Sequence, residues 1–250
     1  KDKVSDNAEK IATRIKKINA QKKIHIKEIQ FDCDWSDKTQ RNYFYLLEKM
    51  RGVFPKEAFL LSATIRLHQI KYPVRTGVPP VDRGMLMFYN LGKLNNINAS
   101  NSIFNTEDAE KYVEFISKYS LPLDIALPIF TWGVHFRNGR VIGLVNNMQT
   151  KEIMENKCFR IIKNNYFKAT EGCFCSGEYF IKGDILRMEE ITPELCNEAI
   201  NILLPYIKST NFAVVFYHFD SSTTSRYEIQ DFENMYHRCE ELDTILYIQK

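Results

Sequence analysis

Apolar residues recur at every third or fourth position in several stretches, which is the spacing of one face of a helix. In residues 6–19 these positions are Ala8, Ile11, Ala12, Ile15 and Ile18. Ser36 or Asp37 is the expected N-cap of a second helix, and the Thr-Pro pair at 192–193 is typical of a helix start. The pattern predicts helices over 6–19, about 38–51, 106 to about 119, 193–208, and about 228–240.

Between these helices lie short runs that are apolar at successive positions. A strand with apolar residues on both faces is typical of a parallel sheet that is covered by helices on both sides. The alternation of such runs with helices therefore predicts an α/β fold with a parallel sheet. The predicted strands are 24–31, 58–66, 85–90, 123–129, 185–189 and 212–219.

One segment departs from this alternation. In residues 131–146, two runs of alternating character flank the Asn-Gly pair at 138–139, which is a strong signal for a β-hairpin. Residues 149–184 are the least regular part, and 167–180 is read as a second hairpin. No repeat or linker composition divides the chain, so we expect one domain over residues 1–250.

Composition excludes several classes of protein. The formal net charge is only +3, and the one dense basic stretch, Arg14–Lys23, falls on a predicted helix, so nucleic acid is not an expected partner. No apolar run reaches the ~18 residues that a transmembrane helix needs. The six cysteines include a C-x-C at 173–175 but no C-x-x-C pair, and no cofactor or structural zinc is expected.

Ionisable residues two positions apart follow or end four of the predicted strands. Residues i and i+2 of a strand point to the same face, and in parallel α/β folds ligands bind at the carboxyl ends of the strands. We therefore expect a functional site at these ends. The pairs are Asp32/Asp34, Arg66/His68, Arg187/Glu189 and His218/Asp220, and Tyr89 and Trp132 lie at two further strand ends.

Each of these residues also has a structural interpretation. Asp34 or Asp37 could cap the following helix, and Arg66 could pair with Asp32 or Asp34 in a buried bridge. His68, His218 and Trp132 could be ordinary interior residues, with Tyr89 as a hydrogen-bonding wall residue. The acids and histidines suit a metal, but no two His stand at ligand spacing and the neighbouring Arg residues would repel a cation.

Taken together, six segments spread over residues 24–222 resemble a bacterial family of uncharacterised TIM-barrel proteins that are described as glycoside-hydrolase-like. The segments are "IQFDCDW", "LSATIRLHQ", "VPPVDRGMLMFYN", "LPIFTWGVHF", "GDILRMEE" and "VVFYHFDSS", with a helix after the first. The resemblance implies a TIM-barrel-like fold and export to the periplasm or cell surface. The D-x-D of Asp32 and Asp34 is also similar to the acidic strand of chitinase-like barrels, but Ser36 stands where that pattern has Glu.

A complete barrel has eight strands, and the pattern predicts six. We therefore expect an open or partial barrel that is incomplete at its N-terminus, with the hairpin of 131–146 as an insertion.

Three functions follow from the predicted site. A glycoside hydrolase would use Asp34 or Glu189 as acid and Asp32 as stabilising carboxylate, because such enzymes place two carboxyl groups about 5–9.5 Å apart. The alternatives are a non-catalytic barrel that binds a glycan or a protein at the cell envelope, and a metal-dependent hydrolase. Carbohydrate is the expected partner. Its predicted binding residues are Arg66, His68, Tyr89, Trp132, Arg187, His218 and Asp220.

Overall fold

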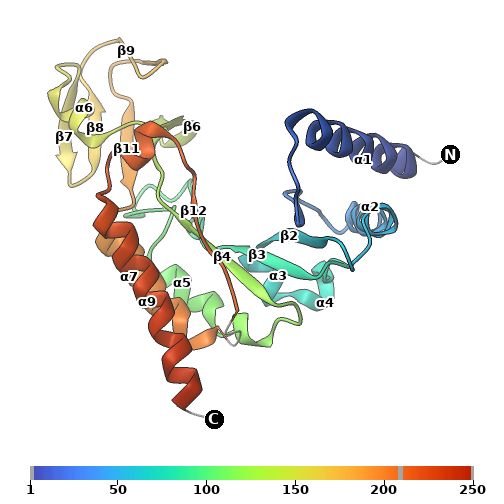
Figure 1. Ribbon diagram of the computed structural model, residues 1–250. Coiled ribbons are helices and arrows are strands. Elements are labelled where there is room, and N and C mark those ends of the chain that lie inside the picture. Colours follow the sequence, from blue (N-terminus) through green and yellow to red (C-terminus); the bar gives the residue numbers. More distant parts are fainter. Residues whose placement is uncertain (1–2, 208–210, 249–250) are drawn as a thin grey trace. The chain divides into compact units, whose positions relative to one another are not determined.

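The structure, a computed structural model, describes residues 3–207 and 211–248, with side chains up to residue 240 (Figure 1). The chain divides into two compact units. Unit 1 consists of Lys1–Met87, Glu114–Ile125 and Ile207–Ala213, and unit 2 of Phe88–Val113, Ala126–Tyr206 and Val214–Lys250. The expectation of one domain over 1–250 stays a prediction.

Five of the six predicted strands form one sheet in the order β1-β2-β3-β4-β12. Strands β1, β2 and β3 pair in parallel, as predicted, with Phe31 opposite Ala63 and Ala63 opposite Gly84. The α/β fold class is thus confirmed. The bounds are Glu28–Phe31 for β1, Leu60–Arg66 for β2, Arg83–Met87 for β3, Leu123–Pro128 for β4 and Val214–Tyr217 for β12.

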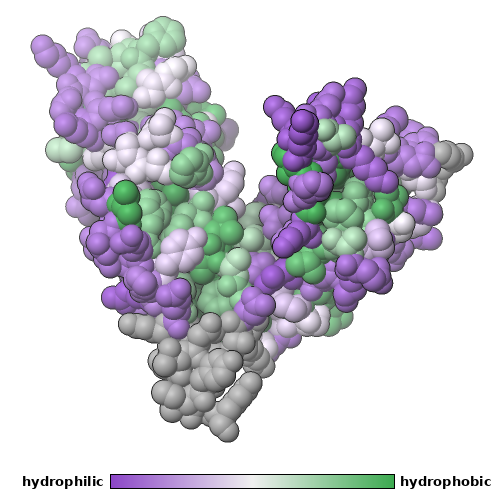
Figure 2. All heavy atoms as spheres, viewed as in Figure 1, coloured by the Kyte–Doolittle hydropathy of each residue, from purple (hydrophilic) through white to green (hydrophobic). Residues whose placement is uncertain are grey.

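In unit 1, helix α1 (Lys3–Lys22) packs on α2 (Gln40–Val53). Helix α1 buries only its alanine positions, Ala8 and Ala12, and hydrophilic side chains dominate its visible surface in Figure 2. The expected N-cap of α2 at Ser36 or Asp37 is wrong. Helix α2 starts from Thr39, because the carbonyl of Ser36 accepts the N–H groups of Thr39 and Gln40 in a preceding turn. The short helices are α3 (Leu67–Lys71), α4 (Pro73–Thr76) and the 3₁₀ turn η1 (Ile116–Lys118).

Unit 2 contains an antiparallel sheet with the order β6-β5-β11-β8-β7, and a separate β10-β9 pair. Residues 185–189, predicted as a parallel strand, lie in its centre as β11, antiparallel to both β5 and β8. A central strand is apolar on both faces whatever its direction, so the pattern could not distinguish the two arrangements. The bounds are Thr131–Arg137 (β5), Arg140–Asn146 (β6), Phe159–Lys163 (β7), Tyr166–Ala169 (β8), Cys173–Cys175 (β9), Glu178–Phe180 (β10) and Ile185–Glu190 (β11).

Both predicted hairpins are confirmed. The first joins β5 to β6 at Asn138 and Gly139, whose φ angles of 50° and 73° are the left-handed values that a tight two-residue hairpin turn needs. The second joins β9 to β10 at Ser176 and Gly177, with φ angles of 47° and 82°, and it spans 173–180 rather than 167–180, because residues 167–169 belong to β8. Residues 149–158, which gave no clear pattern, include helix α6 (Thr150–Glu155).

Helix α7 (Pro193–Leu203) begins as the sequence predicts, with Thr192 Oγ1 accepting a hydrogen bond from Leu195 N at 3.3 Å. It packs against α5 (Thr106–Val113) and lies beside α9 (Ile229–Ile248) (Figure 1). The α-helix ends earlier than predicted, because Pro205 lies in a 3₁₀ turn, η2 (Leu204–Tyr206), and residue 208 lies outside the described residues. A further short helix, α8, spans Ser221–Thr224.

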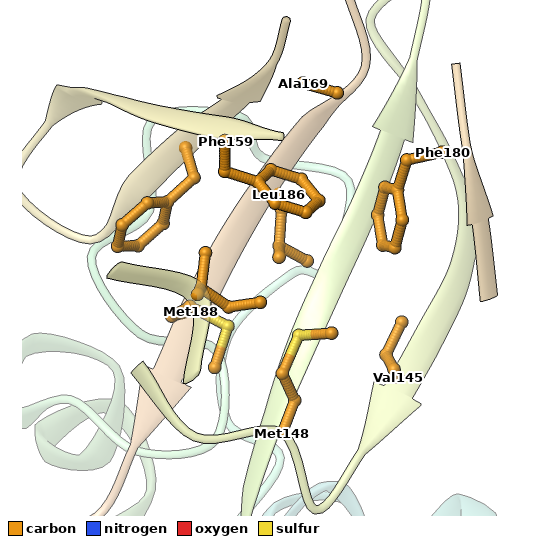
Figure 3. Packing of buried hydrophobic residues seen from close by; sticks show 9 residues of the cluster. Val145, Met148, Phe159, Ala169, Phe180, Leu186 and Met188 are labelled. Carbon is orange, nitrogen blue, oxygen red and sulfur yellow. The ribbon is translucent and has the colours of Figure 1, made fainter. Parts of the chain in front are cut away.

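Nine buried side chains form the core on one side of the antiparallel sheet (Figure 3). Phe180 brings the β9–β10 hairpin into this core, with no exposed surface and its ring 5.1 Å from that of Phe159. Leu186 and Met188 of β11 contribute from the centre of the sheet. The hairpin is therefore held to the sheet by a large aromatic side chain, whose full burial is worth about 1.5–3 kcal/mol.

A buried carboxylate, Asp184, joins this hairpin to β5. Its oxygens accept hydrogen bonds from Arg137 Nε at 3.0 Å, His135 Nε2 at 2.8 Å and the backbone N–H of Ile181 at 2.9 Å. Burial would raise the pKa of Asp184, but the bonds from Arg137, Ile181 and His135 outweigh it and lower the pKa to about 2. The ionised form of Asp184 is therefore the one that the fold stabilises.

This lowered pKa predicts an acid-sensitive contribution to stability. The pKa of Asp184 in the folded protein lies below its unfolded value of about 3.9. The contribution of ionised Asp184 to the free energy of unfolding is therefore complete above pH ~4 and is lost as the pH falls to ~2. It amounts to about 2 kcal/mol. We expect Asp184→Asn to lower the free energy of unfolding at pH 7 by about that amount and to flatten its decline between pH 4 and 2. Urea unfolding across this range measures both. An unchanged pH slope in the variant would contradict the assignment.

Candidate functional site

The parallel register of β1 and β2 determines which residues meet at their carboxyl ends. Phe31 lies opposite Ala63, so the chain after β1 runs beside the last residues of β2. Asp32 accepts a hydrogen bond from Thr64 Oγ1 at 2.9 Å, and Asp34 forms an ion pair with Arg66. The structure thus brings together Asp32, Asp34 and Arg66, as predicted.

The Asp34–Arg66 pair is exposed rather than buried. Their side chains retain 61% and 46% of their accessible surface, so the pair is not the buried bridge that the sequence left open. An exposed ion pair of this kind contributes about 0–1 kcal/mol to folding. The pair therefore contributes little to the stability of the fold and remains accessible to solvent.

Trp35 holds the acidic segment in place. Its indole N–H donates to the carbonyl of Thr76 at 2.7 Å, and its ring stacks on Tyr43 with centroids 5.2 Å apart. Trp35 is buried while Asp32 and Asp34 on its N-terminal side are exposed. The indole therefore fixes the backbone that presents the two carboxylates.

His68 lies on helix α3 and not at the end of a strand, because β2 ends at Arg66 and the helix begins at Leu67. Arg66 N donates to Gln69 Oε1 at 2.7 Å, and this hydrogen bond stabilises the transition from strand β2 to helix α3. Burial first, and then the positive charges of Arg66 and Arg75, lower the pKa of His68, with Asp34 acting in the opposite direction. His68 is thus an exposed, predominantly neutral imidazole near the Asp34–Arg66 pair.

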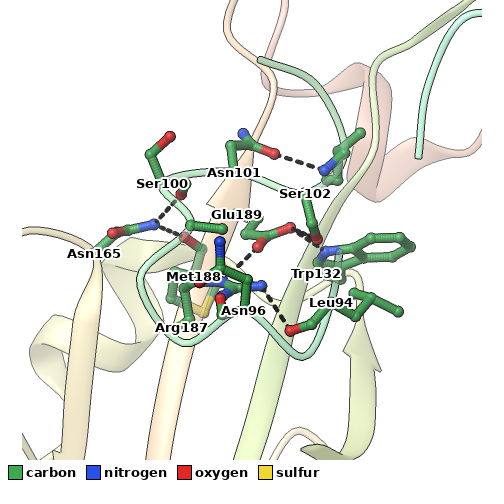
Figure 4. A network of polar contacts seen from close by, with 12 residues as sticks. Leu94, Asn96, Ser100, Asn101, Ser102, Trp132, Asn165, Arg187, Met188 and Glu189 are labelled. Atoms are coloured by element: carbon green, nitrogen blue, oxygen red, sulfur yellow. Dashed lines mark hydrogen bonds and ion pairs between the residues drawn. The ribbon is translucent and has the colours of Figure 1, made fainter. Parts of the chain in front are cut away.

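Glu189 is sealed inside unit 2 in a closed network (Figure 4). Its Oε1 accepts from Arg187 Nε at 2.5 Å, and its Oε2 accepts from Trp132 Nε1 at 2.7 Å and Ser102 Oγ at 2.6 Å. The side chains of Arg187 and Glu189 have no exposed surface. The predicted same-face pair exists, but its geometry is that of a structural cluster.

The same network anchors the Asn-rich loop that follows β3. The guanidinium of Arg187 donates to the carbonyl of Asn96 at 2.5 Å and to that of Leu94 at 3.2 Å. Asn165 Nδ2 adds a bond to the carbonyl of Ser100 at 2.9 Å (Figure 4). The pair therefore ties residues 94–102 to β11.

Tyr89 belongs to an aromatic cluster in unit 2. Its ring stacks on Tyr217, with centroids 5.5 Å apart, and meets Phe130 edge to face at 5.7 Å. Phe130 in turn contacts Trp132 at 5.3 Å. Tyr217 is 47% exposed and the nearby Phe219 is 89% exposed, so the cluster has a solvent-facing part.

His218 and Asp220 form an ion pair with each other, but Asp220 has a second role. As the N-cap of α8, it accepts from Ser222 Oγ at 2.6 Å and from Thr223 N at 2.9 Å. These bonds, with the charge of His218 beside them, lower the pKa of Asp220 far below its ordinary value. Asp220 therefore fixes the start of a helix.

The predicted residues fall into separate groups within the two units. Asp32, Asp34, Arg66 and His68 gather in unit 1. In unit 2, Trp132, Arg187 and Glu189 are sealed in one cluster, while Tyr89, His218 and Asp220 lie around Phe130 and α8. The sequence analysis assigned no role to Tyr217 and Phe219, although exposed and half-buried residues alternate over 214–219.

Among the described residues, no group of three or more His, Cys, Asp or Glu is placed to hold a metal ion. A polar cavity of about 420 Å³ in unit 2 is lined by Lys93, Ser100, Asn105 and six further residues of the Asn-rich loop and α5, none of them predicted site residues. In the same described part of the chain, no helix has the length and apolar character needed to cross a bilayer.

Solved structures with a similar fold include chitinases and a related lytic enzyme. Catalytic domain 2 of the Group II chitinase of Ostrinia furnacalis aligns with a TM-score of 0.54 and 12% identity, covering 94% of this chain and 71% of that chain. The spore cortex-lytic enzyme SleL of Bacillus cereus aligns at 0.55 and 12%, covering 92% and 53%. A mutant family 18 chitinase of Cycas revoluta, in complex with (GlcNAc)4, aligns at 0.50 and 10%, covering 96% and 73%.

At these identities the likeness shows the fold alone. It confirms a TIM-barrel-like α/β fold for this chain. No protein-family model and no curated protein matches the sequence.

The buried pair predicts strong energetic coupling. Glu189→Leu leaves the Arg187 charge buried without a partner, and we expect it to lower the free energy of unfolding by about 3–5 kcal/mol. With Arg187→Met added, the total loss should be smaller than the sum of the two single losses by about 1–3 kcal/mol. Urea unfolding of the four proteins in this cycle measures the coupling.

The exposed pair Glu114–Lys118, with side chains 58% and 62% exposed, provides the matched control. The corresponding cycle with Glu114→Leu and Lys118→Met should give a coupling below about 1 kcal/mol. Equal coupling in the two cycles would show that burial of Arg187 and Glu189 does not set their energetics.

Proposed function

We propose that this protein binds carbohydrate at the carboxyl ends of β1 and β2 in unit 1. The observation that carries the proposal is the exposed cluster of Asp32, Asp34 and Arg66. The buried indole of Trp35 holds the backbone that presents the two carboxylates. Barrel folds bind their ligands at this end of the strands. The fold likeness to chitinases, one of them in complex with (GlcNAc)4, supports a sugar as the ligand.

The chemistry of the cluster suits sugar hydroxyl groups. Ionised carboxylates accept hydrogen bonds, and a guanidinium donates several in fixed directions, so Asp32 and Arg66 offer complementary partners to a polyol. The neutral imidazole of His68 adds a group that can donate and accept. Because the groups are exposed, a ligand can reach them without opening the fold.

Binding is favoured over hydrolysis by the state of the predicted acids. Hydrolysis needs two carboxyl groups on either side of the sugar bond, one of which gives up a proton. Asp34 is paired with Arg66, and Glu189 is buried with both oxygens occupied. Ser36 stands where the chitinase-like pattern has its third acid. The roles predicted for Asp32, Asp34 and Glu189 in catalysis stay predictions.

Hydrolysis is the second candidate function, favoured by the exposed carboxylate of Asp32. The setting that we propose for either function is outside the cytoplasm, in the periplasm or at the cell surface, which is the context that the resemblance implies.

The test is binding to an array of glycans that includes oligomers of N-acetylglucosamine, followed by calorimetry on the best ligand. We expect Arg66→Ala and Asp32→Asn each to weaken binding about tenfold or more, because each removes a charge-assisted hydrogen bond worth about 1.5–3 kcal/mol. Arg14→Ala, at an exposed arginine of α1, is the control and should bind as wild type does.

Turnover of the same glycans is measured in parallel with Asp34→Asn and Glu189→Gln. Binding without turnover supports the proposal. Turnover that is lost in Asp34→Asn would replace it by hydrolysis. Failure of the wild-type protein to bind or cleave any glycan of the array would refute both.

A further inference from the structure

Three cysteines of unit 2 gather on one side of the antiparallel sheet. Cys173 and Cys175 are two residues apart in β9, so their side chains share a face. Together with Cys158, which precedes β7, they pack against the buried cluster around Phe180. All three are free thiols and are only partly buried, so small reagents can reach them.

The backbone of Cys158 is held from both sides. Its N–H donates to Asn156 Oδ1 at 2.9 Å, and its carbonyl accepts from Thr170 N at 2.8 Å and from Thr170 Oγ1 at 3.0 Å. Its thiol faces Glu171, with Sγ 3.8 Å from Oε1. The position of this sulfur is thus determined by the fold.

Cys173 is the cysteine that meets this thiol. It lies opposite Phe180 in the β9–β10 pair. Burial, and then a hydrogen bond with the Cys158 thiol, raise the pKa of Cys173 to about 12. Cys175 has another partner, since its Sγ accepts from Asn156 Nδ2 at 3.5 Å. Of the other two thiols, Cys158 is the one that acts more strongly on Cys173.

A metal site would be another use of clustered thiols, but no such group is placed for one within the described residues. We propose that Cys158 and Cys173 are a reversible redox pair, which forms a disulfide by exchange with a small disulfide of the glutathione class. This modification site is independent of the carbohydrate site in unit 1.

The exchange proceeds in two balanced steps. One thiol of the pair loses its proton and attacks the small disulfide, forming a mixed disulfide and releasing one small thiol. The second protein thiol then loses its proton, attacks the mixed disulfide at the protein sulfur and releases the second small thiol. Two protein thiols are oxidised to one disulfide, and the small disulfide is reduced to two thiols.

Oxidation would fasten the β9–β10 hairpin to the segment before β7. In the reduced protein the hairpin is held by Phe180 and by Arg137 and Asp184. A covalent bond at Cys173 adds a second attachment at the other strand. Because the thiolate is the attacking species and the Cys173 pKa is raised, exchange should be faster at pH 9 than at pH 7.

The full chain is incubated with oxidised glutathione under native conditions, alkylated, digested without reduction and mapped by mass spectrometry. We expect a cross-linked peptide that joins Cys158 to Cys173, lacks two hydrogens and is lost after dithiothreitol. Cys175→Ser should retain this peptide and Cys158→Ser should abolish it. Hydrogen exchange of residues 173–180 should slow in the cross-linked protein.

Cys33 is the internal comparison, because it is exposed and lies in the other unit. It should give only a mixed disulfide with glutathione, which proves that the reagent was active. Recovery of Cys158 and Cys173 as free thiols or as separate mixed disulfides, while Cys33 is modified, would overturn the proposal. A link from either residue to Cys175 in the wild-type protein would overturn it as well.

Discussion

The ion pair between Arg187 and Glu189 is the interaction on which the inner part of unit 2 depends. Removing two such charges from water costs several kcal/mol per ion, and mutual attraction offsets this only when the remaining polar atoms also find partners. Here Trp132, Ser102 and two loop carbonyls supply them. Strand β11, the loop over 94–102 and the indole of β5 are therefore joined through one buried network.

Residues of the same chemical types have a different role in unit 1. Asp34 and Arg66 meet at the ends of two parallel strands, but they remain exposed, and their attraction is screened by water. Little folding energy depends on them, and they are accessible for the binding that we propose. Burial, more than the type of residue, distinguishes the structural acid–base pair of this chain from the exposed pair of the proposed binding surface.

Most local structure could be predicted from the sequence, because turn and cap chemistry act over a few residues. Asn138-Gly139 and Thr192-Pro193 illustrate this. The direction of β11 could not be predicted, since two-sided burial is the same in parallel and antiparallel sheets. The complete burial of Glu189 could not be predicted either, because its hydrogen-bond partners Ser102 and Trp132 are distant in sequence. The D-x-D segment follows a strand, as predicted, whereas Trp35, which holds its backbone, was not assigned a role.

Each of the two tryptophans of the chain is buried in a different unit and donates its indole N–H to a fixed acceptor. The rings of Trp35 and Tyr43 have centroids 5.2 Å apart, and those of Trp132 and Phe130 are 5.3 Å apart. Trp132 also contacts the carboxylate of Glu189. Indole emission shifts with the polarity of its surroundings, so the chain carries one tryptophan reporter in each unit. Replacing either indole by Phe leaves a single tryptophan, whose spectrum reports the unfolding of its own unit, and comparing the two variants tells whether the units unfold together or in turn.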